Sequence, residues 1–466
     1  MKKMILFFVI VFILYLILGT TLPYVHHKEV AKEFKTEFNN MIFTDNSACS
    51  DRIAYVADNV KALKYRLWMT EQAEEEIIIS TFDFNSDKAG ITLMSSLQNA
   101  ANRGVKIKIL VDGISGFLDL RGNEWFLALV SNENIRIKIY NPVNLLKPWG
   151  IQVRLHDKYF IVDDKMYLLG GRNTTNLFLG DYSKDKNHDR EIFAYTEEKS
   201  EDSSLNQVKN YFQKVWELNE SKEYICKNEK TKKIVQAYEN LETAYDDIKQ
   251  MYPDVYQKST NKEKTYVVNK ITLLYNPIQA ENKEPWLWYA LVSMMKTGQE
   301  ILIHTPYIIL SDKMSEDLKA VCEKTENVSI IINDPVSGAN PWGCTDYLNQ
   351  KEDILDTGVR VYEYMGLHSK HSKIVLIDNR ISILGSFNFD MRSAYLDTEM
   401  MLVIDSKEFN QDLQKETQTD KSYSKSIQSD ESYIYGENYK EKKNSALKEI
   451  SYALLRILIK PVRHLL

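Results

Sequence analysis

The chain has 466 residues, of which 44% are hydrophobic and 27% are charged, and its formal net charge at pH 7 is -6. This composition is ordinary for a globular protein, and the length allows two to three domains. The negative balance disfavours a nucleic acid as partner, because proteins that bind one present a basic surface, although a local basic groove stays compatible with it.

The first 23 residues have the pattern of a membrane anchor. Lys2 and Lys3 precede an uncharged apolar run over residues 4–18, which continues to Pro23 and approaches the minimum length of a spanning helix. A cleaved signal peptide is the alternative, but no small-x-small cleavage site ends the run. The charge rule is nearly balanced, and the short leading tail favours a cytoplasmic amino terminus. We therefore expect a single-pass anchor (residues 1–23) in the cell membrane, with the rest of the chain outside the cytoplasm.

Two halves of the chain repeat one order of elements. Short β-branched runs predict buried strands, and glycine after a periodic stretch marks a helix end. In the first half the strands are expected at 76–80, 105–112, 134–140 and 189–193, and the helices at 60–75 and 91–103. In the second half the matching strands are expected at 300–304, 328–334, 358–364 and 397–401, and the helices at 286–297 and 313–324. Alternating strands and helices predict an α/β fold, here as two similar α/β lobes over residues 51–216 and 271–410.

Three further segments are polar or amphipathic. Residues 217–270 are polar and helix-prone, with a break at Pro253, and predict a helical linker between the lobes. Residues 411–445 are rich in Ser, Lys, Asp, Glu and Tyr, which predicts a partly disordered or loosely helical segment. Residues 446–466 place leucine and isoleucine at helical spacing among basic residues. They predict an amphipathic helix that either lies in a membrane interface or docks on a lobe.

One pattern of five residues occurs twice with identical spacing. The first copy is His156, Lys158, Asp163, Gly170 and Asn173, and the second is His371, Lys373, Asp378, Gly385 and Asn388. With each residue type at ~5% usage, five fixed types match by chance at on the order of one position in 10^6. Two copies in one chain therefore indicate a duplicated functional unit.

Histidine, lysine and asparagine together suit attack on a phosphodiester. One imidazole can attack phosphorus while the other protonates the leaving group, because a pKa near ~6.5 allows both protonation states near neutrality. Two lysines and two asparagine amides can hold the negative oxygens. The protein thus supplies the positive charge itself. No spacing resembles a zinc site, and the carboxylates do not cluster with the motif histidines, so we expect no metal and no other cofactor.

This arrangement resembles the phospholipase D superfamily, whose hallmark is a duplicated HxKxxxxDxxxxxxGxxN motif. Both copies match at every fixed position, and the likeness extends from about residue 51 to residue 406. The strings at 385–393 (GSFNFDMRS), 396–399 (LDTE) and 100–105 (AANRGV) are similar to the bacterial cardiolipin synthase branch. The resemblance implies two pseudo-symmetric lobes with one shared active site.

The resemblance also implies roles for individual residues. A covalent phosphohistidine would form on His156, with His371 as the general acid. The residues that would bind phosphate are Lys158, Lys373, Asn173 and Asn388. An acidic residue on the strand after each motif would orient a catalytic histidine, and Glu191 and Glu399 occupy that place. The expected supporting residues are Asp163, Asp378, Gly170, Gly385 and Ser386, and the counterpart of this serine in the first copy is Gly171.

The superfamily includes both lipid enzymes and nucleases, so the substrate is a separate question. An anchored site without a lysine or arginine cluster near the motifs favours a phospholipid over a nucleic acid. We expect a membrane-bound phosphatidyltransferase of the cardiolipin synthase type that acts on phosphatidylglycerol. The alternatives are a phospholipase D that hydrolyses head groups and, after it, an exported nuclease. Trp149 and Trp342 either offer aromatic surface to acyl chains or belong to the core, and Cys49 and Cys226 could pair if the lobes are exported.

Overall fold

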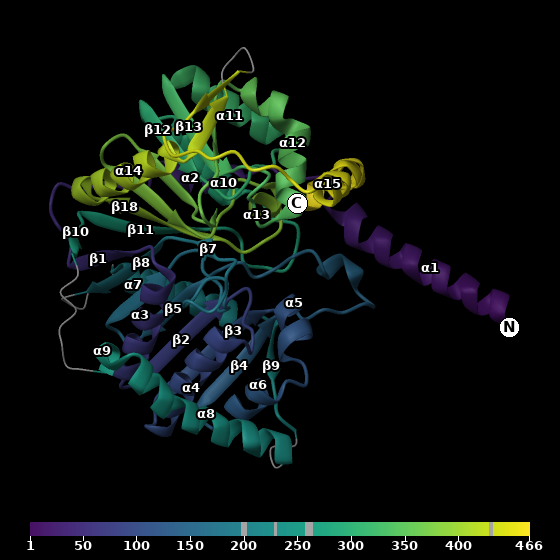
Figure 1. Ribbon diagram of the computed structural model, residues 1–466, viewed down its shortest axis with the longest axis vertical. Helices are drawn as coiled ribbons and strands as arrows, with labels where there is room; N and C mark the ends of the chain where they lie inside the picture. The colour runs from purple at the N-terminus through teal and green to yellow at the C-terminus, as the bar shows by residue number, and fades with distance from the viewer. Residues whose placement is uncertain (197–202, 228–230, 257–263, 428–431) are drawn as a thin grey trace.

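The computed structural model describes residues 1–196, 203–227, 231–256, 264–427 and 432–466. Among these residues, two nine-stranded sheets form two lobes, which lie one above the other in Figure 1. The first lobe is purple to teal, and the second is green to yellow. The expected pair of α/β lobes is therefore confirmed.

The first lobe is built around the strand order β10-β1-β8-β6-β5-β2-β3-β4-β9. Its strands are β1 (Asp51–Val56), β2 (Glu76–Thr81), β3 (Lys106–Asp112), β4 (Ile135–Tyr140), β5 (Tyr159–Val162), β6 (Met166–Leu169), β8 (Glu191–Thr196), β9 (Ser221–Tyr224) and β10 (Tyr266–Val267). Its main helices are α3 (Asn59–Gln72), α4 (Lys88–Asn102), α6 (Glu124–Leu129), α7 (Ser204–Trp216) and α8 (Lys232–Met251). Only the pairs β2–β3 and β3–β4 are parallel among the described strands of this sheet.

The second lobe repeats this topology in the order β11-β18-β17-β16-β12-β13-β14-β19-β20. Its strands are β11 (Lys270–Tyr275), β12 (Glu300–His304), β13 (Asn327–Asn333), β14 (Arg360–Tyr364), β16 (Ile374–Ile377), β17 (Ile381–Gly385), β18 (Met400–Asp405), β19 (Ser424–Ile427) and β20 (Tyr433–Tyr435). Its main helices are α10 (Trp286–Met295), α11 (Asp312–Lys324), α12 (Pro341–Leu355), α13 (Met391–Tyr395) and α14 (Lys407–Ser422). The strands expected from residues 189 and 397 begin later, at Glu191 and Met400.

Apolar side chains form three core clusters. One lies within each lobe, between the sheet and its outer helices. The third joins the inner faces of both sheets, with residues from β2 and β12 and from helices α7 and α14. Gln207 on α7 crosses the junction, because its side chain donates to the carbonyl of Ile271 (3.2 Å) and accepts from the amide of Leu273 (2.9 Å). This shared core fixes the relative position of the two lobes.

The segment expected to link the lobes is itself part of the first lobe. It contributes β9 and β10 to opposite edges of the first sheet, and it forms the helices α8 and α9 (Pro253–Tyr256). Ala237, Leu241 and Ile248 on α8 enter the first core. Helix α9 starts at Pro253, so the predicted break is confirmed. Part of the segment lies outside the described residues.

The polar segment after residue 410 is more ordered than its composition indicates. Helix α14 continues to Ser422, and β19 then pairs with β14 at the edge of the second sheet. Residues 428–431 lie outside the described chain. The final helix is α15 (Ala446–Ile459), followed by the 3-10 turn η4 (Lys460–Leu465).

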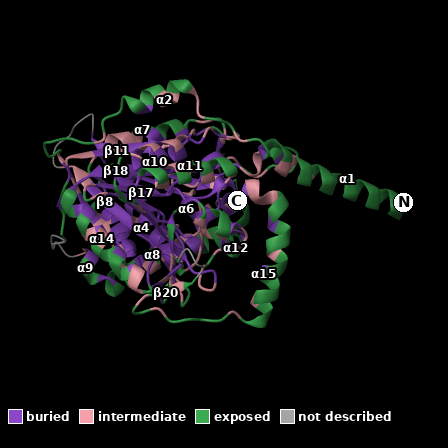
Figure 2. Cartoon of the chain, turned by 90° about the horizontal axis from the view of Figure 1, so that it is seen from above, coloured by how far each residue is buried: buried purple, intermediate pink, exposed green. Residues whose placement is uncertain are grey.

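Helix α1 (Lys2–Thr21) projects away from the lobes (Figure 1), and most of its residues are exposed (Figure 2). With the turn η1 (Leu22–Tyr24) it is long and apolar enough to cross a membrane. Helix α2 (Lys32–Asn39) follows and packs on the second lobe. The cysteines are free thiols. Cys49 and Cys226 do not pair, because Cys49 precedes β1 near one edge of the first sheet and Cys226 follows β9 at the other edge.

Candidate active site

Each motif is carried by a two-stranded hairpin. His156 and Lys158 lead into β5, Asp163 lies in the turn to β6, and Gly170 follows β6. The second motif is arranged in the same way around the β16–β17 hairpin. Burial is high throughout, with Lys158 1% and Lys373 2% exposed, while the side chains of His156 and His371 retain 15% and 20% of their accessible surface.

The two motifs meet because each one pairs with a segment of the other lobe. Leu155, just before the first histidine, forms a parallel bridge with Thr398, and the His156 amide donates to the Thr398 carbonyl (3.2 Å). On the other side, β15 (Ser369–Lys370) pairs in parallel with β7 (Asn187–His188), and the His371 amide donates to the His188 carbonyl (2.7 Å). The charges of Lys373 and His371 both act on His156. The two motifs therefore share one site at the lobe junction.

His156 is oriented by a carboxylate of the second lobe. Its Nδ1 lies 2.7 Å from Oε1 of Glu399, which is fully buried. The hydroxyls of Ser386 and Ser393 donate to the same carboxyl group, the latter at 2.6 Å. The expected roles of Glu399 and Ser386 agree with this geometry. Ser393 was not singled out by the sequence.

His371 is oriented by a carboxylate of the first lobe, but it is not Glu191. Its Nδ1 lies 2.6 Å from Oδ2 of Asp189. Glu191 instead pairs with two buried guanidinium groups, those of Arg66 (2.6 Å) and Arg172 (3.2 Å). The expectation that Glu191 orients a histidine is therefore wrong, and Asp189 orients His371 in its place.

Asp189 and not Glu191 serves His371 because the strand pairing of the two halves differs by two residues from the match of their sequences. Gly385 pairs with Met401 in the second sheet, and Leu169 pairs with Ile192 in the first, so Gly170 stands opposite Glu191. Glu191 is thus the counterpart of Met401, and Asp189 is the counterpart of Glu399. Aspartate is shorter than glutamate, so its carboxyl group lies close to the backbone. A Cβ atom at Gly171 would overlap with Oδ2 of Asp189, which explains why the first copy lacks the serine.

The two carboxylates differ in their tendency to ionise. Burial raises the pKa of Glu399 well above its usual value, although Lys158 and the serine hydroxyls oppose this rise. Burial also acts to raise the pKa of Asp189, but the charges of Lys373 and His371 outweigh it, so this pKa falls well below its usual value. Asp189 is thus an anion that can stabilise the protonated ring of His371. Glu399, the partner of His156, favours a neutral His156 ring.

Burial and neighbouring lysines hold both imidazoles neutral in the ligand-free site. The pKa of His156 is lowered well below 6.5 by burial, Lys158 and Lys373. The pKa of His371 is lowered to about 4 by burial and Lys373, against the opposing effect of Asp189. Burial also lowers the lysine pKa values, to about 8 for Lys158 and about 7 for Lys373. A bound phosphodiester anion would favour the charged forms of the two lysines and of His371.

Each motif lysine contacts the histidine of its own motif. Nζ of Lys158 donates to the His156 carbonyl (2.5 Å), and Nζ of Lys373 lies 2.8 Å from Nδ1 of His371. Within the described part of the chain, the amide oxygens of Asn173 and Asn388 are buried without a hydrogen-bond partner. Buried polar groups in native proteins are usually paired. Because an oxygen only accepts hydrogen bonds, a phosphate would have to contact the NH2 groups of these amides and not their unpaired oxygens.

The motif aspartates and glycines support the fold, as expected. Asp163 and Asp378 occupy hairpin turns with φ of 51° and 52°. Oδ1 of Asp163 accepts from the amides of Glu75 and Glu76 (both 2.9 Å), and Oδ1 of Asp378 accepts from those of Gln299 (2.8 Å) and Glu300 (2.9 Å). Gly170 and Gly385 allow a close approach of neighbouring strands, because an added Cβ would meet the chain at Glu191 or Met400.

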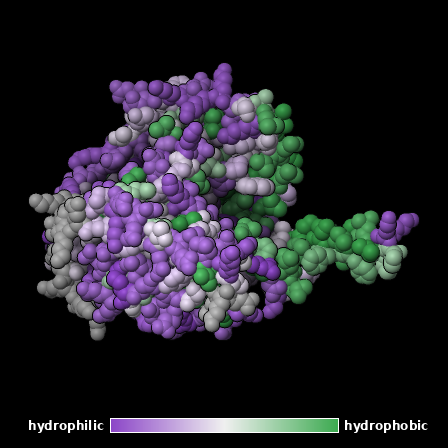
Figure 3. All heavy atoms as spheres, turned by 60° about the horizontal axis from the view of Figure 1, so that its bottom comes forward, coloured by the Kyte–Doolittle hydropathy of each residue, from purple (hydrophilic) through white to green (hydrophobic). Residues whose placement is uncertain are grey.

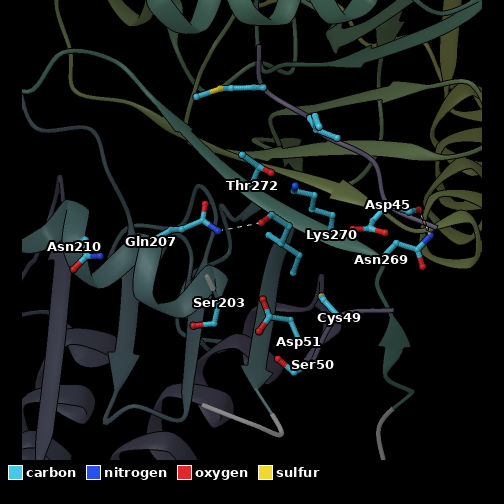
Figure 4. Close-up of a pocket in the computed structure, with 13 residues that line it drawn as sticks. Asp45, Cys49, Ser50, Asp51, Ser203, Gln207, Asn210, Asn269, Lys270 and Thr272 are labelled. Carbon is cyan, nitrogen blue, oxygen red and sulfur yellow. Dashed lines mark hydrogen bonds between the residues drawn. The ribbon is translucent and has the colours of Figure 1, made fainter. Parts of the chain in front are cut away.

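A pocket of about 730 Å³ lies elsewhere, between the first strand of each lobe and the segment around Asp45 and Cys49. Figure 4 shows polar residues in its lining, including Ser203 and Lys270. None of the motif residues lines it. We therefore place the proposed reaction at the two motifs and not in this pocket.

Two α/β lobes that share one site with a duplicated set of histidine, lysine and asparagine define a phospholipase D-like enzyme. The family model described as cardiolipin synthase, PLD-like domain, matches residues 69–216 and 291–421. The chain belongs to this family, and it is a phospholipid phosphatidyltransferase.

Individual relatives agree with this assignment. Cardiolipin synthase C of Escherichia coli K12 is 25% identical over 406 residues, which are 76% of this chain and 81% of the relative. A cardiolipin synthase of Clostridium perfringens SM101 is 24% identical over 390 residues, with 81% of this chain and 72% of the relative covered. The crystal structure of phosphatidylserine synthase from Haemophilus influenzae Rd KW20 has a TM-score of 0.63 at 17% identity, over 93% of this chain and 99% of that one, and supports the fold.

Proposed function

We propose that this enzyme is a membrane-bound cardiolipin synthase, which transfers a phosphatidyl group from one phosphatidylglycerol molecule to another and releases glycerol. The observation that carries the mechanism is the unequal pair of carboxylates behind the two histidines. Glu399 favours a neutral His156, and ionised Asp189 favours a protonated His371. A neutral ring is the nucleophile, and a protonated ring is the acid.

In the first step, the N–H at Nδ1 of His156 donates to Oε1 of Glu399, which leaves the lone pair on Nε2, and Nε2 attacks the phosphorus. A nitrogen–phosphorus bond forms, the bond to the glycerol oxygen breaks, and His371 gives its proton to that oxygen. Lys158 and Lys373, with the two asparagine amides, stabilise the charge on the non-bridging oxygens. Substrate binding prepares His371 for this role, since the phosphate anion offsets the charge of Lys373 that lowers its pKa.

In the second step, the hydroxyl of another phosphatidylglycerol attacks the phosphohistidine. His371, now neutral, takes the hydroxyl proton, the oxygen–phosphorus bond forms, and the bond to His156 breaks. The names of the relatives favour a lipid acceptor. An anchored enzyme also meets neighbouring lipid at a high effective concentration, which favours lipid over water as the acceptor.

Trapping the intermediate tests the roles of the histidines. Wild-type enzyme mixed with phosphatidylglycerol labelled in its phosphatidyl group should yield an acid-labile phosphoenzyme after rapid denaturation. His156→Ala should abolish the label and His371→Ala should not, although both should lose nearly all turnover because the two rings act as a unit. A label that persists in His156→Ala and disappears in His371→Ala would reverse the assignment.

Product analysis tests the substrate and the acceptor. Purified enzyme in phosphatidylglycerol vesicles should release cardiolipin and glycerol, with phosphatidic acid as a minor product. Phosphatidic acid as the main product would make the enzyme a hydrolase. DNA cleavage without lipid turnover, in a parallel incubation, would refute the lipid substrate.

A further inference from the structure

Three apolar elements converge at the end of α1. They are α1 itself, the loop 143–150 of the first lobe, and helix α15 at the carboxyl terminus. We infer that the loop and α15 insert into the same membrane leaflet as the end of α1, so that the lobes rest on the bilayer at a fixed orientation. The partner of the apolar surface that these elements form is the lipid bilayer. The inference concerns the site of the proposed function, but its evidence and its test do not depend on turnover.

The loop lies against α1 well inside the apolar span. The hydroxyl of Tyr15 donates to the carbonyl of Leu146 (2.8 Å), and Gly19 packs on Pro148 so closely that an added Cβ would collide with it. Tyr15 precedes the end of the span by about two helical turns, or roughly 10 Å along the axis. If α1 crosses a bilayer, the tip of the loop is therefore submerged to about that depth. Its side chains suit this position, because Leu145, Leu146 and Trp149 are 49%, 74% and 49% exposed.

Helix α15 docks on the second lobe through a side that mixes polar and apolar residues, while its longer apolar stripe faces away from the lobe. Nζ of Lys448 donates to the Val336 carbonyl (2.8 Å), and Nε of Arg456 donates to the side chain of Asn349 (2.9 Å). Tyr452 and Ile459 are buried against the lobe. The apolar stripe faces outward, with exposed fractions from 57% to 76%, and comprises Leu447, Ile450, Leu454, Ile457 and Leu458.

The direction of α15 fits a helix in the membrane plane. In Figures 1 and 2 it runs across the axis of α1, beside the point where α1 meets the lobes. His464 in η4 lies 3.2 Å from the carbonyl of Thr21, at the end of α1. Figure 3 shows a column of hydrophobic side chains beside the base of α1, whereas most of the remaining visible face is hydrophilic. A spanning helix and an interfacial helix are expected to meet in this way.

One residue connects this surface to the active site. Arg392, four residues after Asn388, donates to the carbonyl of Gln152 beyond the loop (2.7 Å) and to that of Leu465 in η4 (3.1 Å). Its charge also acts on His156. The elements that insert into the leaflet are therefore tied to the residues that hold the phosphate, which sets the site near the level of the lipid head groups.

Photo-crosslinking to lipid tests the inference in the full-length protein. The photoreactive residue p-benzoylphenylalanine replaces Leu146, Leu454 or, as a matched control, the exposed Gln250 at the far end of α8. Each variant is reconstituted in vesicles that contain phosphatidylglycerol with labelled acyl chains, and then irradiated. We expect labelled lipid on the proteins substituted at 146 and 454, at least tenfold above the control.

Two outcomes would overturn the inference. Labelling at 454 that does not exceed the control would leave α15 in water, and crosslinked dimers at 454 in place of lipid adducts would make α15 a contact between copies. Crosslinking needs no catalysis, so these outcomes are distinct from a failure of the proposed reaction. The combined change Leu454→Asp and Leu458→Asp adds a second readout, because it should reduce lipid labelling at 146 at least threefold if α15 helps hold the loop in the leaflet. Undiminished labelling at 146 would count against the coupled surface.

Discussion

Replacement of Asp189 by asparagine removes one charge and keeps the shape of the side chain. In the structure this carboxylate contacts Nδ1 of His371 at 2.6 Å and is fully shielded from solvent. A hydrogen bond to a charged group contributes about 1.5–3 kcal/mol. If this contact is made mainly in the transition state, where His371 carries the proton, kcat should fall about 10- to 150-fold.

The replacement should also change the pH dependence of kcat in a definite direction. His371 must be protonated to release the leaving group, and Asp189 raises its pKa against burial and Lys373, which lower it. Loss of the negative charge removes the raising effect, so the pKa falls further. The alkaline limb of the kcat–pH profile should therefore move to lower pH in Asp189→Asn. The apparent pKa values belong to the coupled histidines and lysines and not to one residue.

The assay is release of glycerol from phosphatidylglycerol vesicles across a pH series, with Glu191→Gln as the matched control. Glu191 neutralises two buried arginines, so its loss should lower the unfolding free energy by about 3–5 kcal/mol. It should leave the alkaline limb of the remaining folded enzyme in place. A shifted limb in Glu191→Gln, together with an unchanged limb in Asp189→Asn, would refute the cross-lobe assignment.

Three further predictions follow from the supporting residues and the anchor. Asp378→Ala removes two hydrogen bonds to backbone amides and places alanine at φ 52°, so thermal unfolding should show that the unfolding free energy falls by about 2 kcal/mol. The kcat of the folded enzyme should stay within about twofold of wild type. A large loss of kcat without a change in stability would place Asp378 in the chemistry. Gly171→Ser forces a Cβ atom onto Asp189 and should reduce kcat at least tenfold. Ser386→Gly should reduce kcat less, because Ser393 still donates to Glu399. A larger loss of kcat in Ser386→Gly than in Gly171→Ser, measured by steady-state kinetics, would contradict the packing argument. Protease added to intact protoplasts should digest the lobes if Lys2 and Lys3 stay in the cytoplasm, and full protection would place the lobes inside.

The residues that we propose to perform the chemistry could be identified from the sequence because a duplicated motif is a local signal. The intervals from His156 to Asn173 and from His371 to Asn388 are identical, and both copies form the same hairpin. The strands around them were also predictable, since buried runs such as Glu76–Thr81 are apolar along their length. The supporting role expected of Asp163 agrees with its hydrogen bonds to the amides at the start of β2, although these partners lie 87 and 88 positions away in the chain.

The carboxylate partners of the two motif histidines could not be read from the sequence. Both halves contain an aspartate and a glutamate two residues apart, at 189–191 and at 397–399. Alignment of these strings matches Glu191 with Glu399, whereas the strand pairing matches Asp189 with Glu399. A shift of two residues along a strand leaves every side chain on the same face, so the hydrophobic pattern does not reveal it. The structure resolves the register through the strand neighbours of Gly170 and Gly385.

The same limit applies to contacts between distant segments. The sequence showed that residues 446–466 form an amphipathic helix, and α15 confirms the helix. Which side of it faces the lobe depends on Val336 and Asn349, more than 100 positions away in the chain. The contact of Tyr15 with Leu146 likewise spans 131 positions. The sequence by itself determined the repeated units and the residues proposed to react, because local spacing encodes them. The tertiary structure alone decided which carboxylate serves which histidine and which surface stays apolar, because those depend on how two separately patterned lobes pack against each other.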